Sequence, residues 1–187
     1  MNTLSRSASR LRTAKLRRLS PGVLQSTPVD LTWVMEALRR PILTPADDMT
    51  SLRQRREAIV RQHADAENRH DVEATIDTFH QPRYEFNGHP SDGEQAVREL
   101  LHGFMHGISD SHLEIIRLRH MDDGVLVEGV VTGTHDGEWA GIPPTGRRIE
   151  VPVVGIFEFD ADRLLCEKVH LNMGKVLKQM GVLPAVS

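Results

Sequence analysis

The sequence of 187 residues contains a single cysteine, Cys166. One cysteine excludes an internal disulfide bond and is typical of a reducing compartment, so we expect a cytoplasmic protein. Cys166 lies within a strand pattern, which favours a small core or interface residue over a nucleophile.

Long apolar runs are also missing. No stretch approaches the roughly 20 consecutive apolar residues that a bilayer-spanning helix needs. No apolar core of a secretory signal follows the basic residues near the start. The sequence therefore predicts no secretory signal and no membrane partner.

Charge is distributed unevenly along the chain. Residues 1–20 contain six basic and no acidic residues, whereas the formal net charge is −3, so the remainder carries −9. A body this acidic argues against nucleic acid as the main partner. The composition of residues 1–20 also fits a transit peptide. We interpret them as a basic tail, because their leucines form only a loose stripe.

Signatures of cofactor sites are missing as well. The sequence has neither G-x-G-x-x-G nor a P-loop, and no serine stands in a nucleophile-elbow context. His102 and His106 have the i, i+4 spacing of a metal pair but lie off the apolar stripe of their predicted helix, so we expect them to be exposed. We therefore expect a site without metal or cofactor.

Prolines mark the organisation of the chain. Four of them interrupt residues 20–50 and leave only 31–40 as a short helical pattern. We expect 1–50 to be a basic extension and linker, partly disordered with a short helix. Residues 51–187 then form the folded domain.

The pattern of this domain changes from helical to β. A first helix is predicted from Thr50 or Ser51 to about Arg69, then a short second helix, and a third capped by Asp92. From His112 onward the runs are β-rich. The expected strands are 112–120, 124–135, 147–160 and 163–172. This order indicates an α+β domain, with a curved, mainly antiparallel sheet wrapping three helices.

Residues 133–148, GTHDGEWAGIPPTGRR, are the most informative stretch. Two prolines and a Thr-Gly pair predict an ordered turn between antiparallel strands. Trp139 and Ile142 place apolar bulk where a solvated turn would carry polar residues. We therefore expect both side chains to contact a ligand.

The strand 147–160 is apolar on both faces, with Val154 and Ile156 on the face opposite Phe157. A strand buried on both faces implies that the outer face of the sheet is covered. We therefore expect a homodimer whose two sheets pack against each other.

Three residues are candidates for chemistry. Glu167 shares a strand face with apolar neighbours, and burial would raise its pKa toward that of a general acid or base. The alternative is a structural pair with an arginine or a backbone cluster, which is slightly favoured because buried acids are usually partnered. Glu85 and Asn87 share one face of a short strand, and the pattern leaves open whether that face or its aromatic opposite points inward. His63, on the apolar side of the first helix, could move a proton or simply fill the core.

Residues 133–148, with Val60-Arg61-Gln62-His63 and Phe157-Glu158-Phe159, resemble the SnoaL-like polyketide cyclase family of the nuclear transport factor 2-like (NTF2-like) superfamily. The likeness covers roughly residues 52–183. It implies a cone-shaped α+β barrel, a hydrophobic pocket and a dimer. Known activities of this class include aldol ring closure and double-bond isomerisation, run by carboxylates or histidines without cofactors.

The resemblance also locates residues. Asn87, Gly155 and Val169 stand where related enzymes look to have ionisable catalytic groups, so neither known mechanism transfers unchanged. The same registration turns six residues toward the cavity: Glu85, Asn87, Gly155, Glu167, Val169 and Leu171.

We therefore expect Glu85, Glu167 and His63 to act as an acid–base set in a cofactor-independent cyclase or isomerase. Its substrate would be a bulky apolar carbonyl compound, polyketide- or steroid-like. The expected ligand contacts are Asn87, Trp139, Ile142, Phe157, Val169 and Leu171. The alternative is a non-catalytic protein that binds a small hydrophobic molecule; a third, weaker reading is an epoxide hydrolase.

Overall fold

The computed structural model of the protein describes residues 45–183. The predicted basic tail and the short helix at 31–40 lie outside the described residues. No helix within 45–183 is both long and apolar enough to cross a membrane.

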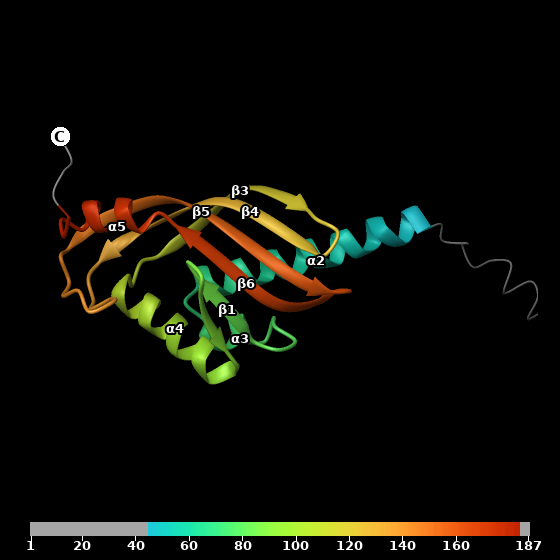
Figure 1. Ribbon diagram of the computed structural model, residues 1–187, viewed down its shortest axis with the longest axis horizontal. Helices are drawn as coiled ribbons and strands as arrows, with labels where there is room; N and C mark the ends of the chain where they lie inside the picture. The colour runs from blue at the N-terminus through green and yellow to red at the C-terminus, as the bar shows by residue number, and fades with distance from the viewer. Residues whose placement is uncertain (1–44, 184–187) are drawn as a thin grey trace, which may run out of the picture. The chain divides into compact units, whose positions relative to one another are not determined.

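Six strands of the described chain form one sheet in the order β2-β1-β6-β5-β4-β3. The strands are β1 (Arg83–Phe86), β2 (His89–Asp92), β3 (His112–His120), β4 (Gly124–His135), β5 (Arg147–Asp160) and β6 (Arg163–Leu171). Neighbouring strands are antiparallel, except that β1 and β6 run parallel. The sheet curves, and the helices α2, α3 and α4 lie on its inner side (Figure 1). This is the predicted α+β architecture.

The helices are α2 (Pro45–Asn68), α3 (Val72–Ile76), α4 (Glu94–Gly107) and α5 (Met173–Gln179). The prediction that the first helix starts at Thr50 or Ser51 is wrong, because α2 begins at Pro45. Proline suits a first helical turn, and the acidic Asp47 and Asp48 there favour the positive end of the helix dipole. Thr50 does not cap the helix; its hydroxyl donates to the Ala46 carbonyl, 2.9 Å away.

The observed strands β3, β4 and β5 have the bounds predicted for them, and β6 ends one residue before its predicted end. The hairpin of β1 and β2 was not predicted. Asn87 and Gly88 turn it with positive φ angles of 47° and 84°. Asp92 therefore belongs to β2 rather than capping the third helix, and Gly93 occupies the N-cap of α4.

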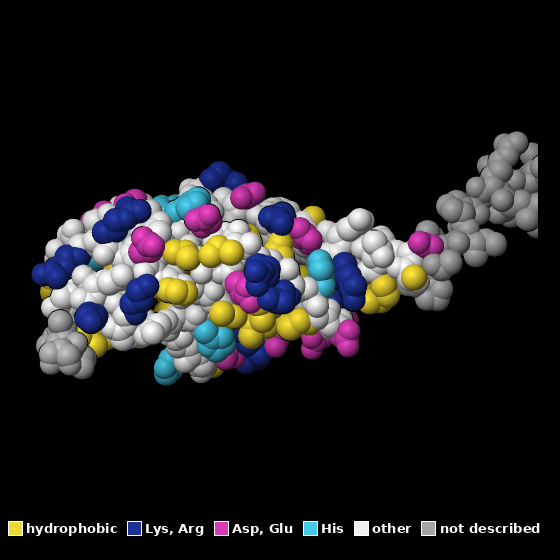
Figure 2. All heavy atoms as spheres, turned by 90° about the horizontal axis from the view of Figure 1, so that it is seen from above, with side chains coloured by type: hydrophobic (Ala, Val, Ile, Leu, Met, Phe, Trp, Pro, Cys, Tyr) yellow, Lys and Arg dark blue, Asp and Glu magenta, His cyan; other side chains and the backbone are white. Residues whose placement is uncertain are grey.

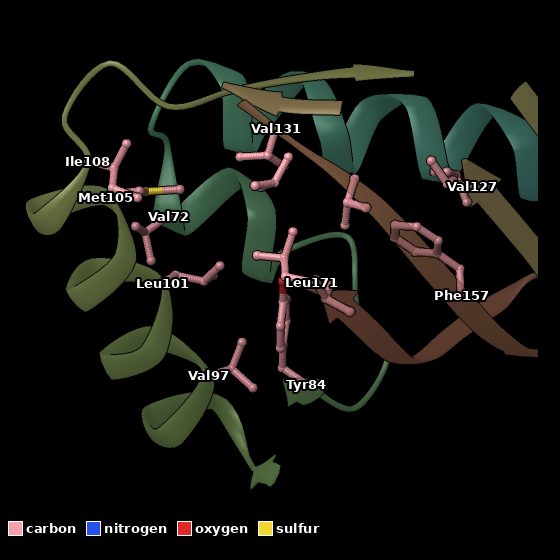
Figure 3. Packing of buried hydrophobic residues seen from close by; sticks show 14 of the residues in the cluster. Val72, Tyr84, Val97, Leu101, Met105, Ile108, Val127, Val131, Phe157 and Leu171 are labelled. Carbon is pink, nitrogen blue, oxygen red and sulfur yellow. The ribbon is translucent and has the colours of Figure 1, made fainter. Parts of the chain in front are cut away.

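The core lies between α4 and the inner face of the sheet. Val97, Leu101 and Met105 follow each other at a spacing of four residues along α4 and are all buried. They point toward sheet residues such as Val131 and Leu171 (Figure 3). Each such buried side chain contributes about 1.5–3 kcal/mol to folding, so this packing holds α4 against the sheet.

The outer face of the sheet carries an apolar patch. We define the outer patch as Ile116, Leu126, Val130, Val154 and Ile156. Ile116 is 62% exposed, and the other four are partly exposed because they alternate with buried, inward-facing neighbours. Hydrophobic side chains lie along the middle of this face, between charged groups (Figure 2).

Candidate active site

A cavity of about 530 Å³ lies among α2, α4 and the inner face of the sheet. Alternate residues of β5 and β6 line it, as strand geometry requires. The sheet residues concerned are Val153, Gly155, Phe157, Glu167, Val169 and Leu171. Most of the lining is apolar, so the few polar groups that reach the cavity determine its chemistry.

Three ionisable groups meet at one end of this cavity. Glu167 of β6 places Oε2 2.9 Å from Nε2 of His63 on α2. Glu67, one helical turn after His63, places Oε1 3.5 Å from the same nitrogen. The side chains of His63 and Glu167 are 0% and 3% exposed, and that of Glu67 is 17% exposed. Glu67 and Glu167 line the cavity and His63 lies behind them.

The contact between His63 and Glu167 is an ion pair and not a well-aligned hydrogen bond. The two atoms are close, yet neither Nε2 nor Oε2 has a hydrogen-bond partner of acceptable geometry. The Coulomb attraction does not require that alignment, whereas a hydrogen bond does. The other oxygen of Glu167, Oε1, lies near Gly155, a cavity-lining residue where an added Cβ would be 3.9 Å from it, so Oε1 is the acceptor beside the cavity.

A chain of hydroxyl and carbonyl groups fixes the other nitrogen of His63. The Thr78 hydroxyl donates to the Thr75 carbonyl over 2.6 Å. Its oxygen is then left to accept from Nδ1 of His63, also 2.6 Å away. Nδ1 therefore carries a proton, and Nε2 is the atom whose protonation varies. The ring is also held edge-on by Phe79 and Phe157, with centroids 5.1 and 5.5 Å away.

The two carboxylates and the imidazole change one another's pKa values. Burial alone would lower the pKa of His63, but the charges of Glu167 and Glu67 outweigh it and raise that pKa to about 10. Burial raises the pKa of Glu167, and the Glu67 charge raises it further, to about 7, despite the opposing effect of His63. At neutral pH Glu167 therefore exchanges a proton while His63 remains an imidazolium.

Tyr84 brings a hydroxyl-bearing ring to the same end. It is the only tyrosine of the chain, lines the cavity, and stands opposite Glu167 in the parallel pairing of β1 and β6. Burial, and next the Glu167 and Glu67 charges, raise the pKa of its hydroxyl well above the usual value. It therefore stays protonated as a donor. The sequence pattern placed Tyr84 only on the aromatic face opposite Glu85 and indicated no role for its hydroxyl.

Glu85 and Asn87 do not line the cavity, contrary to expectation. The aromatic face of β1, Tyr84 and Phe86, points inward instead. Glu85 therefore lies on the outer face, where it stands opposite Lys168 of β6. Asn87 turns the hairpin, and its Oδ1 accepts the Leu171 backbone N–H at 2.9 Å. The structure thus brings Glu167 and His63 together and leaves Glu85 out.

The loop between β4 and β5 supplies the opposite end of the cavity. Trp139 lines it and meets Phe104 of α4 and Phe86 of β1 edge-on, with centroids 5.7 and 6.3 Å away. Ile142 hydrogen-bonds Trp139 through both backbones and packs against the core, but it is not among the lining residues. Gly107 makes room for Trp139, because a Cβ there would lie 2.4 Å from the Trp139 Cβ.

The same three groups are also the set, within residues 45–183, that could hold a metal ion. His63, Glu67 and Glu167 each offer one atom, and these atoms lie within 4.8 Å of one another. The proton on Nε2 of the imidazolium occupies the lone pair that a metal would need. We therefore interpret the cluster as a proton-sharing site. His102 and His106 are exposed, as expected.

Comparison with solved structures identifies similar folds. AclR of Streptomyces galilaeus, a proposed hydroxylase, is 26% identical with a TM-score of 0.62, over 71% of this chain and 84% of that one. A proposed SnoaL-like polyketide cyclase from Jannaschia sp. CCS1 is 18% identical with a TM-score of 0.64, over 70% and 94%. A protein with a ketosteroid isomerase-like fold from Catenulispora acidiphila is 21% identical with a TM-score of 0.58, over 68% and 94%.

No curated protein matches the chain. Residues 57–180, however, match the family described as SnoaL-like polyketide cyclase. That range begins in α2 and ends just after α5, so it includes the curved sheet, the cavity and the proton-sharing cluster. The chain therefore belongs to the SnoaL-like polyketide cyclase family.

Proposed function

We propose that the protein is a cofactor-independent cyclase or isomerase acting on a bulky apolar carbonyl compound. The family and the hydroxylase and cyclase neighbours support a cyclase-type role. The observation that carries the proposal is the position of Glu167, a buried carboxylate that contacts His63, lies close to Glu67 and lines a largely apolar cavity. Burial there raises its pKa to about 7. Such a group gives and takes protons at neutral pH.

The chemistry begins with Glu167 as a base. Its carboxylate takes a proton from the carbon next to the substrate carbonyl, and the electron pair of that C–H bond moves onto the carbonyl oxygen as an enolate. The Tyr84 hydroxyl donates a hydrogen bond to the enolate oxygen. His63 does not reach the substrate; its positive charge holds part of the Glu167 population ionised. His63 is therefore a positioning residue.

Two outcomes are open to the enolate. In an isomerisation, protonated Glu167 returns the proton to a different carbon of the conjugated system. In a cyclisation, the enolate carbon attacks a second carbonyl of the same molecule, and the new alkoxide takes the proton. Gly155 and Val169, at the positions where relatives look to have acidic or basic groups, line the cavity without an ionisable group. Glu167, two residues before Val169, takes over proton transfer.

The test is proton exchange on a panel of polycyclic ketones, followed by the loss of NMR signal in deuterated water. We expect Glu167→Gln to slow exchange by about 10²–10⁴-fold with ligand binding retained. Glu85→Gln is the matched control on the outer face and should keep the wild-type rate. Unchanged exchange in Glu167→Gln would reject the proposal. Binding without exchange in the wild type would favour the non-catalytic ligand-binding alternative.

We also propose that two copies associate through the outer patch. Five apolar side chains exposed or partly exposed on one sheet face support this, because such patches on soluble proteins mark contact surfaces. Sedimentation should give twice the chain mass for the wild type. Val154→Lys should yield a folded monomer, since it places a charge in the middle of the patch; a dimer unaffected by this change would exclude the patch as the interface.

A further inference from the structure

The proton-sharing end of the cavity holds more negative than positive charge. Glu67 and Glu167 both face the single imidazole of His63, at 3.5 and 2.9 Å. One imidazolium balances one carboxylate, so the fully ionised cluster keeps a net charge of about −1. No lysine or arginine lines the cavity within residues 45–183. An uncompensated charge in such a partly buried place is unfavourable.

Glu167 also keeps an acceptor without a donor. Its Oε2 lies against Nε2 of His63, at 2.9 Å. The other oxygen, Oε1, lies on the side of Gly155, a cavity-lining residue where an added Cβ would be 3.9 Å from it, and it takes no part in the contact with His63. Buried carboxylate oxygens are normally paired, and an unpaired one beside an open cavity points to a ligand group that completes it. A ligand that brings both an N–H donor and a positive charge would satisfy the oxygen and the net charge together.

We propose that this cavity takes a cationic ligand: an apolar ring compound whose protonated amine enters first and donates N–H bonds to Glu67 and Glu167. The strand register sets its direction. Tyr84 stands opposite Glu167, and Phe86 stands opposite Val169, two residues further along. Phe86 meets Trp139, so the ring body extends from the carboxylates toward this aromatic end.

The cationic ligand would occupy the same cavity as the substrate of the proposed function, on which this inference rests. It narrows that substrate to an amino-substituted carbonyl compound. A nitrogen cation beside the reacting carbon would also oppose the negative charge that develops on the enolate. An anionic substrate would meet two carboxylates and no basic side chain other than the imidazolium already paired behind them. Carboxylic acids of the same shape are therefore excluded by charge.

A divalent metal ion is the competing cation, because the three donor atoms lie within 4.8 Å of one another. The two occupants place different demands on His63. A metal needs the Nε2 lone pair free, whereas an ammonium group needs only the carboxylate oxygens. The short contacts from Nε2 to both carboxylates favour a proton on that nitrogen, and this favours the organic cation.

The test compares three probes of one shape by calorimetry at neutral pH: naphthylmethylammonium, naphthylmethanol and naphthoate. We expect the ammonium to bind about tenfold tighter than the alcohol, and the carboxylate to bind weakest. Glu67→Gln should remove most of the preference for ammonium over alcohol. Glu114→Gln, an exposed outer-face control, should keep it. Equal binding of ammonium and alcohol, or an unchanged preference in Glu67→Gln, would overturn the proposal.

A zinc titration of the metal-stripped protein completes the design. Micromolar Zn²⁺ binding that is lost in Glu67→Gln and blocks the ammonium probe would assign the cluster to a metal and overturn the proposal. Weak or absent Zn²⁺ binding beside tight ammonium binding would support it. Both experiments measure binding only, so they test the cation proposal even if no ketone in the panel exchanges its protons. Conversely, exchange of neutral ketones without cation preference would leave the proposed function intact.

Discussion

Glu67 is the residue through which the acidity of the cavity can be changed without touching the proposed base. Replacing it by glutamine keeps the side-chain shape and removes one negative charge. Its charge helps to raise the pKa of Glu167 to about 7. We therefore expect Glu67→Gln to lower the pKa of Glu167, because the carboxylate form would no longer face a second carboxylate.

The geometry sets the size of this change. The cluster atoms of Glu67 and Glu167 lie within 4.8 Å of each other. At an effective dielectric constant of about 20, two unit charges at that separation repel by about 3 kcal/mol. This corresponds to about two pH units. Since the Glu67 side chain is 17% exposed, water screens part of the effect, and we expect a fall of about 1–2 pH units in the pKa of Glu167.

The assay is the carbon-13 chemical shift of the glutamate side-chain carboxyl groups, followed from acid to alkaline pH. Glu114→Gln serves as the control for loss of a carboxylate elsewhere and should leave the titration of Glu167 in place. A Glu167 pKa that differs by less than about 0.3 between wild type and Glu67→Gln would refute the reasoning. Burial alone would then account for the raised value.

Two further predictions concern stability. Gly107→Ala should destabilise the fold by about 1–3 kcal/mol in urea unfolding, because the new methyl would lie 2.4 Å from the Trp139 Cβ. Stability should also fall as pH rises. Glu167 and His63 bind protons more tightly when folded, so their contribution is complete below their ordinary pKa values of 4.5 and 6.5. It is lost as pH rises through their folded values of about 7 and 10.

Each stability prediction has a control. Gly103→Ala lies in the same helix, and an added Cβ meets nothing within 4 Å, so it should leave stability unchanged or increase it. A Gly107→Ala protein as stable as the wild type would show that Trp139 moves freely. The control for the pH prediction is Glu167→Gln, which should make the unfolding free energy depend less on pH in the range where Glu167 titrates. An unfolding free energy that rises from pH 5 to pH 9 would contradict the sign of both shifts.

The long strands could be predicted because their signals are local. Alternating apolar residues, interrupted by turn signals such as the two prolines and the Thr-Gly pair of 133–148, predicted the bounds of β3, β4 and β5 without any knowledge of what these strands pack against. The start of α2 was missed because Thr50 matched a capping residue while Pro45 and Asp47 carried a competing start signal further upstream. The β1–β2 hairpin was missed although Asn87-Gly88 is a strong hairpin signal.

The candidate site was predictable only in part. Glu167 stood out as an acid in an apolar strand, and His63 as a histidine on an apolar helix face. The inward face of β1 depends on its parallel pairing with β6, which no local pattern encodes. That pairing placed Tyr84 in the cavity and Glu85 outside it. Glu67 was missed although its i, i+4 spacing from His63 on α2 is a local signal. Its nearness to Glu167 depends on the packing of α2 against β6, which no local pattern encodes.

The order of the elements along the chain also bears on how the site forms during synthesis. The base comes from the last strand of the sheet and its imidazole partner from the first described helix, so every intervening strand separates them along the chain. A nascent chain leaving the ribosome can form α2, α4 and the β3–β5 meander before Glu167 has been synthesised. The acid–base pair is therefore among the last contacts to close, and a chain released early would have an empty groove with no reactive carboxylate.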